Sequence, residues 1–297
     1  MAQTIGFFDG VHRGHKHLLR QVADEADRRG LKSMVVTFKQ HPRKVLQHDV
    51  SVPLLTTTDE KLKLIEQCGV DNVALLDFTP QLAQMDARQY METVLRDQLH
   101  GRALVIGYDH HFGRRDGSGF AQYRQYGKEL GIDVVLATQL PLEGSLHASS
   151  TVVRNALING DVKLANEILG RPYTLTGTVA HGEAIGRTIG FPTANIKPEC
   201  ADKLIPHNGV YAVKTLVGNT TVNGMLYIGE RPTFNNLTER RIEANLFDFN
   251  GEIYGQTITI AFVAKVRDEQ RFDSLEQLKE QLKIDRAQVE NILNTSL

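Results

Sequence analysis

The hydrophobic pattern of the chain changes near residue 173, and this change limits its fold more than any other feature. Before it, short apolar runs alternate with amphipathic, helix-like stretches. The runs are continuous rather than alternating, which is typical of parallel strands covered on both faces. They lie at 33–38, 72–78, 103–107 and 132–137, after an opening apolar run that ends at Asp9-Gly10. We therefore expect an α/β domain with a parallel sheet and helices on both faces over residues 1–170.

After residue 173 the apolar residues recur with period two, and no helix-like stretch separates the runs until about residue 274. Gly, Asn and Pro punctuate them, as turns require. The runs lie at 173–179, 210–214, 222–228, 241–247 and 257–262. Several short strands without intervening helices favour an antiparallel barrel. We expect a mainly β domain over 171–297 that ends in a helix at about 274–294.

Composition limits the class of protein. A chain of 297 residues fits two domains, and 41% hydrophobic with 23% charged residues argues against disorder. The net charge is −1 and no run of Lys and Arg stands out, so we expect no nucleic-acid partner. Cys68 and Cys200 are too few and too far apart for a disulfide framework or a zinc site. Without a signal-peptide pattern or an apolar run of membrane-spanning length, we expect a cytoplasmic enzyme with no membrane partner.

The opening motif predicts a phosphate site. The chain turns through His12-Arg13-Gly14-His15 into an amphipathic helix. The first turn of a helix offers unpaired N–H groups and the positive end of its dipole, which favour an anion. Gly14 lets a bulky anion approach the backbone, and imidazoles can donate to oxygens as charge builds on them. The two histidines also have a spacing that metal ligands use, but no His, Cys or Asp cluster in this half completes a set; a structural role stays open.

Two further segments of the first half suit a nucleotide. Ser150 and Thr151 stand at a predicted helix start, where hydroxyls are ordinary N-caps. Arg154 lies about one turn inside that helix and can bind a second phosphate there. Asp109, in the loop 107–113 after a predicted strand, is a candidate nucleoside contact, although a plain surface loop would explain it equally well.

The informative stretch of the second half is 182–195. A loop spaced by Gly182, Gly186 and Gly190 can wrap phosphates with its N–H groups. Thr193 and Asn195 then offer the hard oxygen ligands that Mg²⁺ prefers beside phosphates, though a turn-rich barrel entrance is the simpler explanation. The chain has no Gly-x-x-x-x-Gly-Lys-Ser/Thr loop, so its phosphate chemistry is not of that type. Glu243 lies in a strand pattern, where a carboxylate is either a general base for a bound alcohol or part of a polar strand face.

Taken in order, these motifs resemble those of the prokaryotic bifunctional riboflavin kinase/FAD synthetase family over essentially the whole chain. Further matching segments are 227–234, Asp248-Phe249, Tyr254-Gly255 and 267–272. Two positions depart from the family pattern. His110 stands where the family usually has an aromatic residue, and Asn245 stands where it often has histidine.

The resemblance implies a Rossmann-like nucleotidyltransferase domain followed by a riboflavin-kinase barrel. The barrel would phosphorylate riboflavin with MgATP to give FMN, and the first domain would transfer AMP from ATP to FMN, giving FAD and pyrophosphate. His12, His15, Ser150, Thr151 and Arg154 would hold the ATP phosphates. Thr193, Asn195 and Asp109 would meet Mg²⁺ or its nucleotide, and Glu243 would take the proton from the ribityl hydroxyl. The other implied nucleotide-binding residues are Gly6, Phe8, Asp9, Gly14, Gly182, Gly186, Arg187 and Arg267.

Three other functions compete with this one. A nucleotidyltransferase for another phosphate ester, such as phosphopantetheine or nicotinate mononucleotide, explains the first half and leaves the barrel motifs unused. An aminoacyl-tRNA synthetase-like enzyme also uses such histidines, but no basic tRNA-binding region is present. A flavin- or nucleotide-binding sensor with one inactive site is disfavoured because the site residues of both halves are intact. A homo-oligomer remains open.

Overall fold

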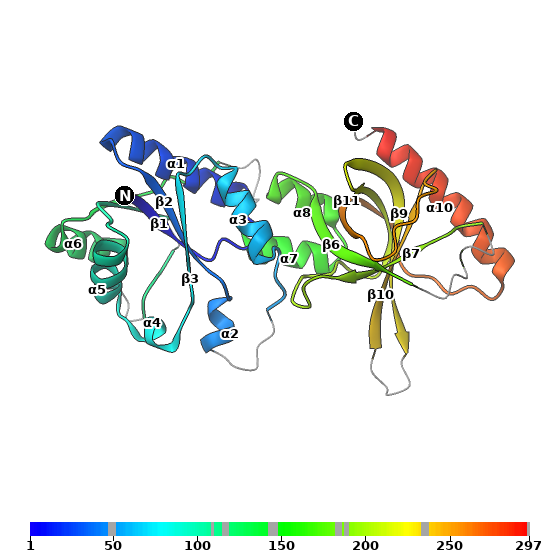
Figure 1. Ribbon diagram of the computed structural model, residues 1–297, viewed down its shortest axis with the longest axis horizontal. Helices are drawn as coiled ribbons and strands as arrows, with labels where there is room; N and C mark the ends of the chain where they lie inside the picture. The colour runs from blue at the N-terminus through cyan, green and yellow to red at the C-terminus, as the bar shows by residue number, and fades with distance from the viewer. Residues whose placement is uncertain are drawn as a thin grey trace. The chain divides into compact units, whose positions relative to one another are not determined.

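The computed structural model describes residues 1–46, 52–107, 110–114, 119–141, 148–181, 186, 190–232 and 238–295. The chain divides into two compact units, Met1–Ser150 and Thr151–Leu297. Figure 1 shows the two kinds of architecture, a helix-covered sheet and a strand barrel. In the described ranges, none of the helices combines the length and the apolar character that crossing a bilayer requires.

A parallel sheet of five strands forms the centre of the first unit, in the order β3-β2-β1-β4-β5. The strands are β1 (Ala2–Ile5), β2 (Ser33–Phe38), β3 (Asn72–Leu76), β4 (Ala103–Ile106) and β5 (Asp133–Leu136). Central β1 pairs with β2 on one side and β4 on the other, so the order of strands reverses there. Ligands of such sheets bind beyond the carboxyl ends of the strands at this reversal. The opening motif lies directly after β1.

Helices cover both faces of this sheet, which confirms the predicted α/β layering. Val35 of β2 packs with α1 (Arg13–Arg29) and α3 (Thr58–Glu66), whereas its neighbours Met34 and Val36 pack on the opposite face. That face is covered by α5 (Ala87–Tyr90), the π-helix η1 (Met91–Gln98) and α6 (Phe120–Leu130). The short helices α2 (Pro42–Leu46) and α4 (Pro80–Gln84) follow β2 and β3. Strand β1 ends at Ile5, before the end of its apolar run, and the chain leaves extended geometry at Phe8, whose φ is 55°.

The second unit is built on a closed antiparallel barrel in the order β10-β7-β6-β11-β8-β9, as predicted. The strands are β6 (Tyr173–Ala180), β7 (Ala194–Pro198), β8 (Gly209–Val217), β9 (Thr220–Pro232), β10 (Thr238–Leu246) and β11 (Thr257–Arg267). Helix α7 (Ser150–Ile158) and helix α8 (Val162–Leu169) precede the barrel. Asn166 of α8 donates to the carbonyl of Phe262 and accepts from the amide of Tyr173, which ties α8 to β11 and β6.

The last helix, α10 (Leu275–Thr295), packs on the outside of the barrel. Its buried Val289 and Leu293 join Val210 and Met225 of the barrel wall in one apolar cluster. The predicted C-terminal helix is thus confirmed, within one residue at each end. The sequence pattern does not predict helix α8 or strand β7. Strand β7 has only five residues and follows a motif that indicates a loop.

Candidate functional site

The loop between β1 and α1 builds the predicted phosphate site. Phe8, Gly10 and Val11 all have positive φ angles, of 55°, 78° and 39°, so the loop turns sharply. His12 is the N-cap of α1, and its Nδ1 accepts the amide of His15 at 3.3 Å. The imidazole therefore caps the helix start, as a Ser or Asp side chain normally does. This geometry places both histidine rings at the N-terminus of α1.

The two histidines form a stacked pair. Their ring centroids are 3.6 Å apart with an angle of 19° between the planes, and the His15 ring also contacts the edge of Phe8. Burial, aided by His12 and then His110, holds the pKa of His15 well below its usual value of 6.5. The His15 Nδ1 is buried and has no hydrogen-bond partner among the described residues. His15 is therefore neutral at pH 7 and can exchange hydrogen bonds with a ligand.

Asp9 fastens this loop to the segment that precedes α3. Its carboxylate is 3% exposed and accepts the amides of Leu55 and Thr56 at 3.0 to 3.1 Å. The Thr56 hydroxyl also bonds to Asp9, at 3.3 Å, and accepts the amide of Gly10 at 3.0 Å. The family resemblance predicts that Asp9 contacts a nucleotide. In the structure, the Asp9 carboxylate instead bonds to Leu55 and Thr56 of the protein itself. It supports the site by holding the loop.

Three other expected binding residues shape the same loop. Phe8 is buried among Val11 and Leu19 in a core cluster. A Cβ at Gly6 would meet the Phe8 ring at 2.9 Å, and a Cβ at Gly14 would lie 3.2 Å from the His12 ring. Gly6 and Gly14 therefore leave room for these rings to pack.

Ser150 comes next to the opening loop although 141 residues separate it from Asp9. Its hydroxyl donates to the Asp9 carbonyl at 2.9 Å. Thr151 and Arg154 follow on the same helix, α7, and belong to the second unit. Asp109 lies outside the described residues. The structure thus brings together Ser150, Asp9 and the two histidines, and the roles of Thr151, Arg154 and Asp109 stay predictions.

In the barrel, strand pairing brings Glu243 to Thr193. Glu243 of β10 stands opposite Asn195 of β7. The Thr193 hydroxyl donates to Oε2 of Glu243 at 3.1 Å, and Nε of Arg241 lies 3.0 Å from Oε1. Both carboxylate oxygens therefore have a partner. Arg241 was not singled out from the sequence, although its place two residues before Glu243 on a strand puts both on one face.

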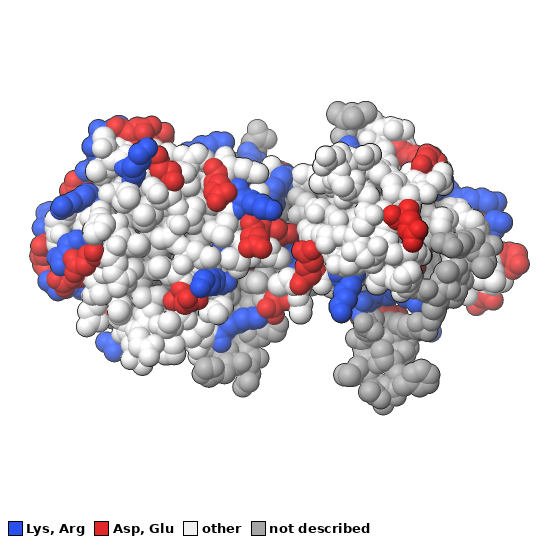
Figure 2. Space-filling model, viewed as in Figure 1, with Lys and Arg blue, Asp and Glu red and all other residues white. Residues whose placement is uncertain are grey.

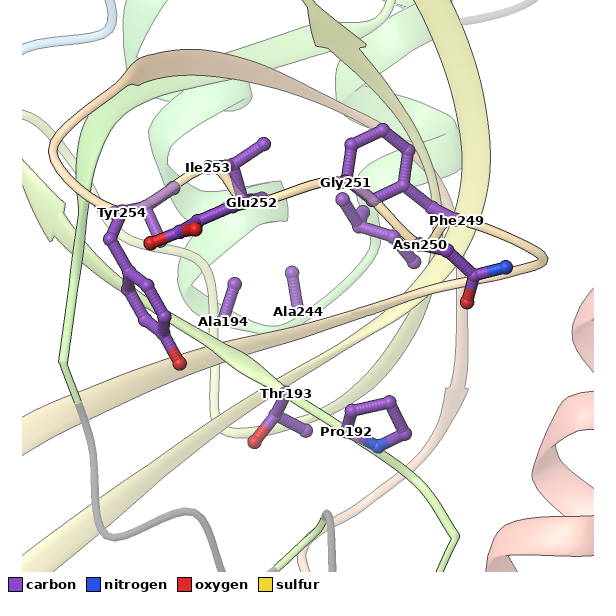
Figure 3. A pocket seen from close by; sticks show the side chains of 12 residues that line it. Pro192, Thr193, Ala194, Ala244, Phe249, Asn250, Gly251, Glu252, Ile253 and Tyr254 are labelled. Carbon is purple, nitrogen blue, oxygen red and sulfur yellow. The ribbon is translucent and has the colours of Figure 1, made fainter.

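Two pockets meet at Thr193. One, of about 400 Å³, has His181 stacked on its wall residue Tyr254, with centroids 3.9 Å apart. Figure 3 shows Tyr254 and Glu252 on one side of this pocket and Pro192 and Thr193 across from them. The other pocket, of about 320 Å³, contains Glu243 and has a mainly apolar wall; the lining residues are Gly186, Phe191, Thr193, Val210, Met225, Tyr227, Arg241, Glu243, Asn245, Arg267, Gln270, Phe272, Leu278 and Leu282. We call the first, lined by Val179, residues 192–194, Ala244, Leu246 and residues 249–254, the Tyr254 pocket, and the second the apolar pocket.

Several expected residues position these walls. Asn245, a departure from the family pattern, donates to the Pro192 carbonyl at 2.6 Å. A Cβ at Gly186 would lie 2.2 Å from the Phe191 carbonyl oxygen, so only glycine fits there. Arg267 lines the apolar pocket while its guanidinium is held by Asp285 of α10. Gly182 and Arg187 lie outside the described residues.

Charge on the surface is mixed. Figure 2 shows Lys and Arg interspersed with Asp and Glu on the visible face, without one broad patch of either sign. In the described residues, no three His, Cys, Asp or Glu side chains group as a metal site. The two candidate sites offer imidazoles at a helix start and a carboxylate–hydroxyl pair beside two pockets.

Comparisons with known proteins identify the family of the chain. Residues 1–152 match the model of the FAD synthetase family, and residues 169–293 match that of the riboflavin kinase family. The chain is 38% identical to the bifunctional riboflavin kinase/FMN adenylyltransferase of Escherichia coli (strain K12), over 94% of this chain and 88% of that protein. It is 36% identical to the protein of the same name from Bacillus subtilis (strain 168), over 95% and 89%. A crystal structure described as a macrolide-efflux protein from Streptococcus pneumoniae has 33% identity and a TM-score of 0.87, and covers 98% of this chain and 94% of that one. The chain belongs to the bifunctional riboflavin kinase/FMN adenylyltransferase family.

Proposed function

We propose that the two reactions of this family take place at the two sites described above, riboflavin phosphorylation in the barrel and FMN adenylylation at the β1–α1 loop. The substrates are riboflavin, FMN and ATP, and the products are FMN and FAD. The single observation that carries the barrel assignment is the Thr193–Glu243 hydrogen bond at the junction of the two pockets. The domains responsible are residues 1–170 for adenylylation and 171–297 for phosphorylation, in the cytoplasm.

In the barrel, ATP occupies the Tyr254 pocket and riboflavin the apolar pocket, whose wall suits a flat ring system. The ribityl hydroxyl then lies beside Glu243, which takes its proton as the oxygen attacks the γ-phosphorus of ATP. Arg241 holds the carboxylate in place through the contact at 3.0 Å. Thr193, Asn195 and the loop with Gly182, Gly186 and Arg187 hold the phosphates. The bond between the γ-phosphorus and the bridging oxygen breaks, and ADP leaves with its electron pair.

The donor set of the barrel site fits Mg²⁺. Mg²⁺ prefers oxygen ligands, keeps several waters and binds largely through substrate phosphates, so it needs only one or two protein oxygens. Thr193, directly before β7, and Asn195, within it, supply a hydroxyl and an amide oxygen, and we assign them this role in the barrel. Asp109 takes the corresponding role in the first domain. When bound, the ion neutralises charge on the phosphates.

At the β1–α1 loop, an oxygen of the FMN phosphate attacks the α-phosphorus of ATP, and pyrophosphate leaves. His12 and His15 donate to phosphate oxygens as negative charge builds on them, a role that suits the neutral imidazole of His15. Ser150, Thr151 and Arg154 hold the remaining phosphates. Neither site uses a covalent nucleophile, since such transfers depend mainly on positioning and charge stabilisation.

The test incubates the full-length protein with riboflavin, ATP and Mg²⁺ and separates FMN from FAD by chromatography. Glu243→Gln should lower FMN formation about a hundredfold to ten-thousandfold, the usual contribution of a general base, while FAD formation from supplied FMN persists. His15→Gln should lower FAD formation about a hundredfold and spare FMN formation. Arg241→Gln keeps the carboxylate and removes its 3.0 Å partner, so it should lower FMN formation less than Glu243→Gln does. Equal loss of both activities in either site variant would contradict the two-site assignment, and turnover of nicotinate mononucleotide in place of FMN would favour the rival function.

A further inference from the structure

Lys61 is a buried cation close to the adenylylation site. Its side chain is 1% exposed, and it stands in the first turn of α3. Its Nζ donates to the carbonyl of Phe38 at 2.6 Å and lies over the ring of Phe7, 4.0 Å from the centroid. Phe38 ends β2, and Phe7 follows the end of β1. Lys61 thus joins the carboxyl ends of the two strands beside the site.

Core stability does not explain a lysine at this place. An ammonium has three donors, and Lys61 makes one hydrogen bond to the residues that the structure describes. A cation in the first turn of a helix also faces the positive end of the dipole. Burial lowers the pKa of Lys61 to about 8, and the charge of Asp9 opposes that shift. An apolar side chain of similar length would avoid each of these penalties.

The β1–α1 loop needs support from its surroundings. Phe8 and Val11 are non-glycine residues at positive φ, a conformation that persists only where neighbouring contacts enforce it. Asp9 holds the middle of the loop through the amides just before α3. Lys61, one turn further along, holds its beginning through the Phe7 ring. The loop is therefore fixed at two points by neighbouring parts of one segment, 55–61.

We infer that Lys61 is a positioning residue for adenylyl transfer: by fixing Phe7 and the end of β2, it keeps the β1–α1 loop in the conformation that presents His12 and His15. This inference rests on the proposed adenylylation site. Lys61 is buried, so it acts through Phe7 and the loop rather than by touching the substrate.

The experiment compares three variants of the full-length protein. Lys61→Met keeps the stem and removes the charge, Lys61→Arg keeps the charge, and Lys63→Met changes an exposed lysine of the same helix. We expect Lys61→Met to lower kcat for FAD formation about tenfold to a hundredfold, the loss that a small misplacement of reacting groups produces. Riboflavin phosphorylation, measured in the same samples, should stay unchanged. Lys61→Arg should recover part of the rate, and Lys63→Met should resemble the parent protein.

A pH profile separates this role from a structural one. Around Lys61, Asp9 of the loop carries a charge, the His41 ring contacts Phe7, and α3 itself carries Asp59, Glu60, Lys63 and Glu66. FAD formation by the parent protein should decline above about pH 8, as Lys61 loses its proton. Lys61→Arg should move that decline to higher pH, and Lys61→Met should lack it.

Two results would overturn the inference: a Lys61→Met protein that makes FAD at the parent rate, or a loss of rate explained by a lower unfolding temperature with an unchanged pH profile. A parent protein that makes FMN but no FAD would instead overturn the proposed adenylylation function, so the two failures are distinguishable.

Discussion

Replacing Asp285 with Asn tests how α10 is held against the apolar pocket. Asp285 is fully buried and accepts three contacts of 2.8 to 3.1 Å from Arg267 and one of 2.9 Å from Gln281. Removing one partner of a buried ion pair costs about 3–5 kcal/mol, because the other charge stays buried without compensation. The Arg267 side chain is 18% exposed, so we expect the lower end, about 3 kcal/mol. For a unit of this size, that lowers Tm by about 6–12 °C.

Scanning calorimetry of the full-length protein provides the measurement, with the transition of the first unit as an internal reference. Because Leu278 and Leu282 of α10 line the apolar pocket, KM for riboflavin should rise while FAD formation from FMN is unchanged at 25 °C. Asp268→Asn is the matched control, since this exposed acid pairs with Lys265 on the surface, where solvent screens the pair, and should leave Tm close to that of the parent protein. A Tm for Asp285→Asn within 2 °C of that control would refute the reasoning.

Three further predictions address the two sites. The folded-state pKa of His15 is lowered, so below its usual value of 6.5 the unfolded chain binds more protons, and the free energy of unfolding of the first unit should fall as pH falls from 7 to 5. Urea unfolding at several pH values should show that this free energy depends less on pH in His15→Gln than in the parent protein, and an equal dependence would contradict the prediction. Asp9→Asn weakens the bonds to the segment before α3 and should lower stability by about 1–3 kcal/mol and FAD formation more than FMN formation; an unchanged denaturation midpoint would count against it. Thr193→Val removes the hydroxyl that donates to Glu243 and should slow FMN formation about tenfold to a hundredfold in initial-rate assays, whereas Thr193→Ser should stay close to the parent rate. Equal rates for the Val and Ser variants would show that the hydroxyl has no role in the reaction.

The layers of the fold follow from local patterns. Continuous apolar runs predict the buried parallel strands, and period-two alternation predicts the barrel strands within a few residues at most ends. Strand β7 escapes this method because its five residues follow a turn that contains Pro192, and because its pairing with β10 depends on residues nearly fifty positions away. The π-helix η1 is equally invisible, since its apolar spacing resembles that of an α-helix at this length.

The sequence predicts which residue types make up the sites, but not which partners their side chains contact. Histidines before a helix and a strand glutamate indicate the chemistry, and the structure then decides which partner each one meets. Asp9 shows the limit: its sequence neighbours suggest a ligand contact, but its amide partners lie 46 residues away. Arg241 shows a signal that was available, because period-two spacing already places it beside Glu243.

The N-cap of α1 has a chemical consequence for His12. Its Nδ1 accepts the His15 amide, so this nitrogen must present a lone pair rather than a proton. In the neutral ring the proton then resides on Nε2, and the capping bond selects that tautomer. The helix therefore determines which end of the imidazole is the hydrogen-bond donor, and it does so before any substrate arrives. Nitrogen chemical shifts of His12 would show an Nε2–H form throughout the pH range in which the cap persists.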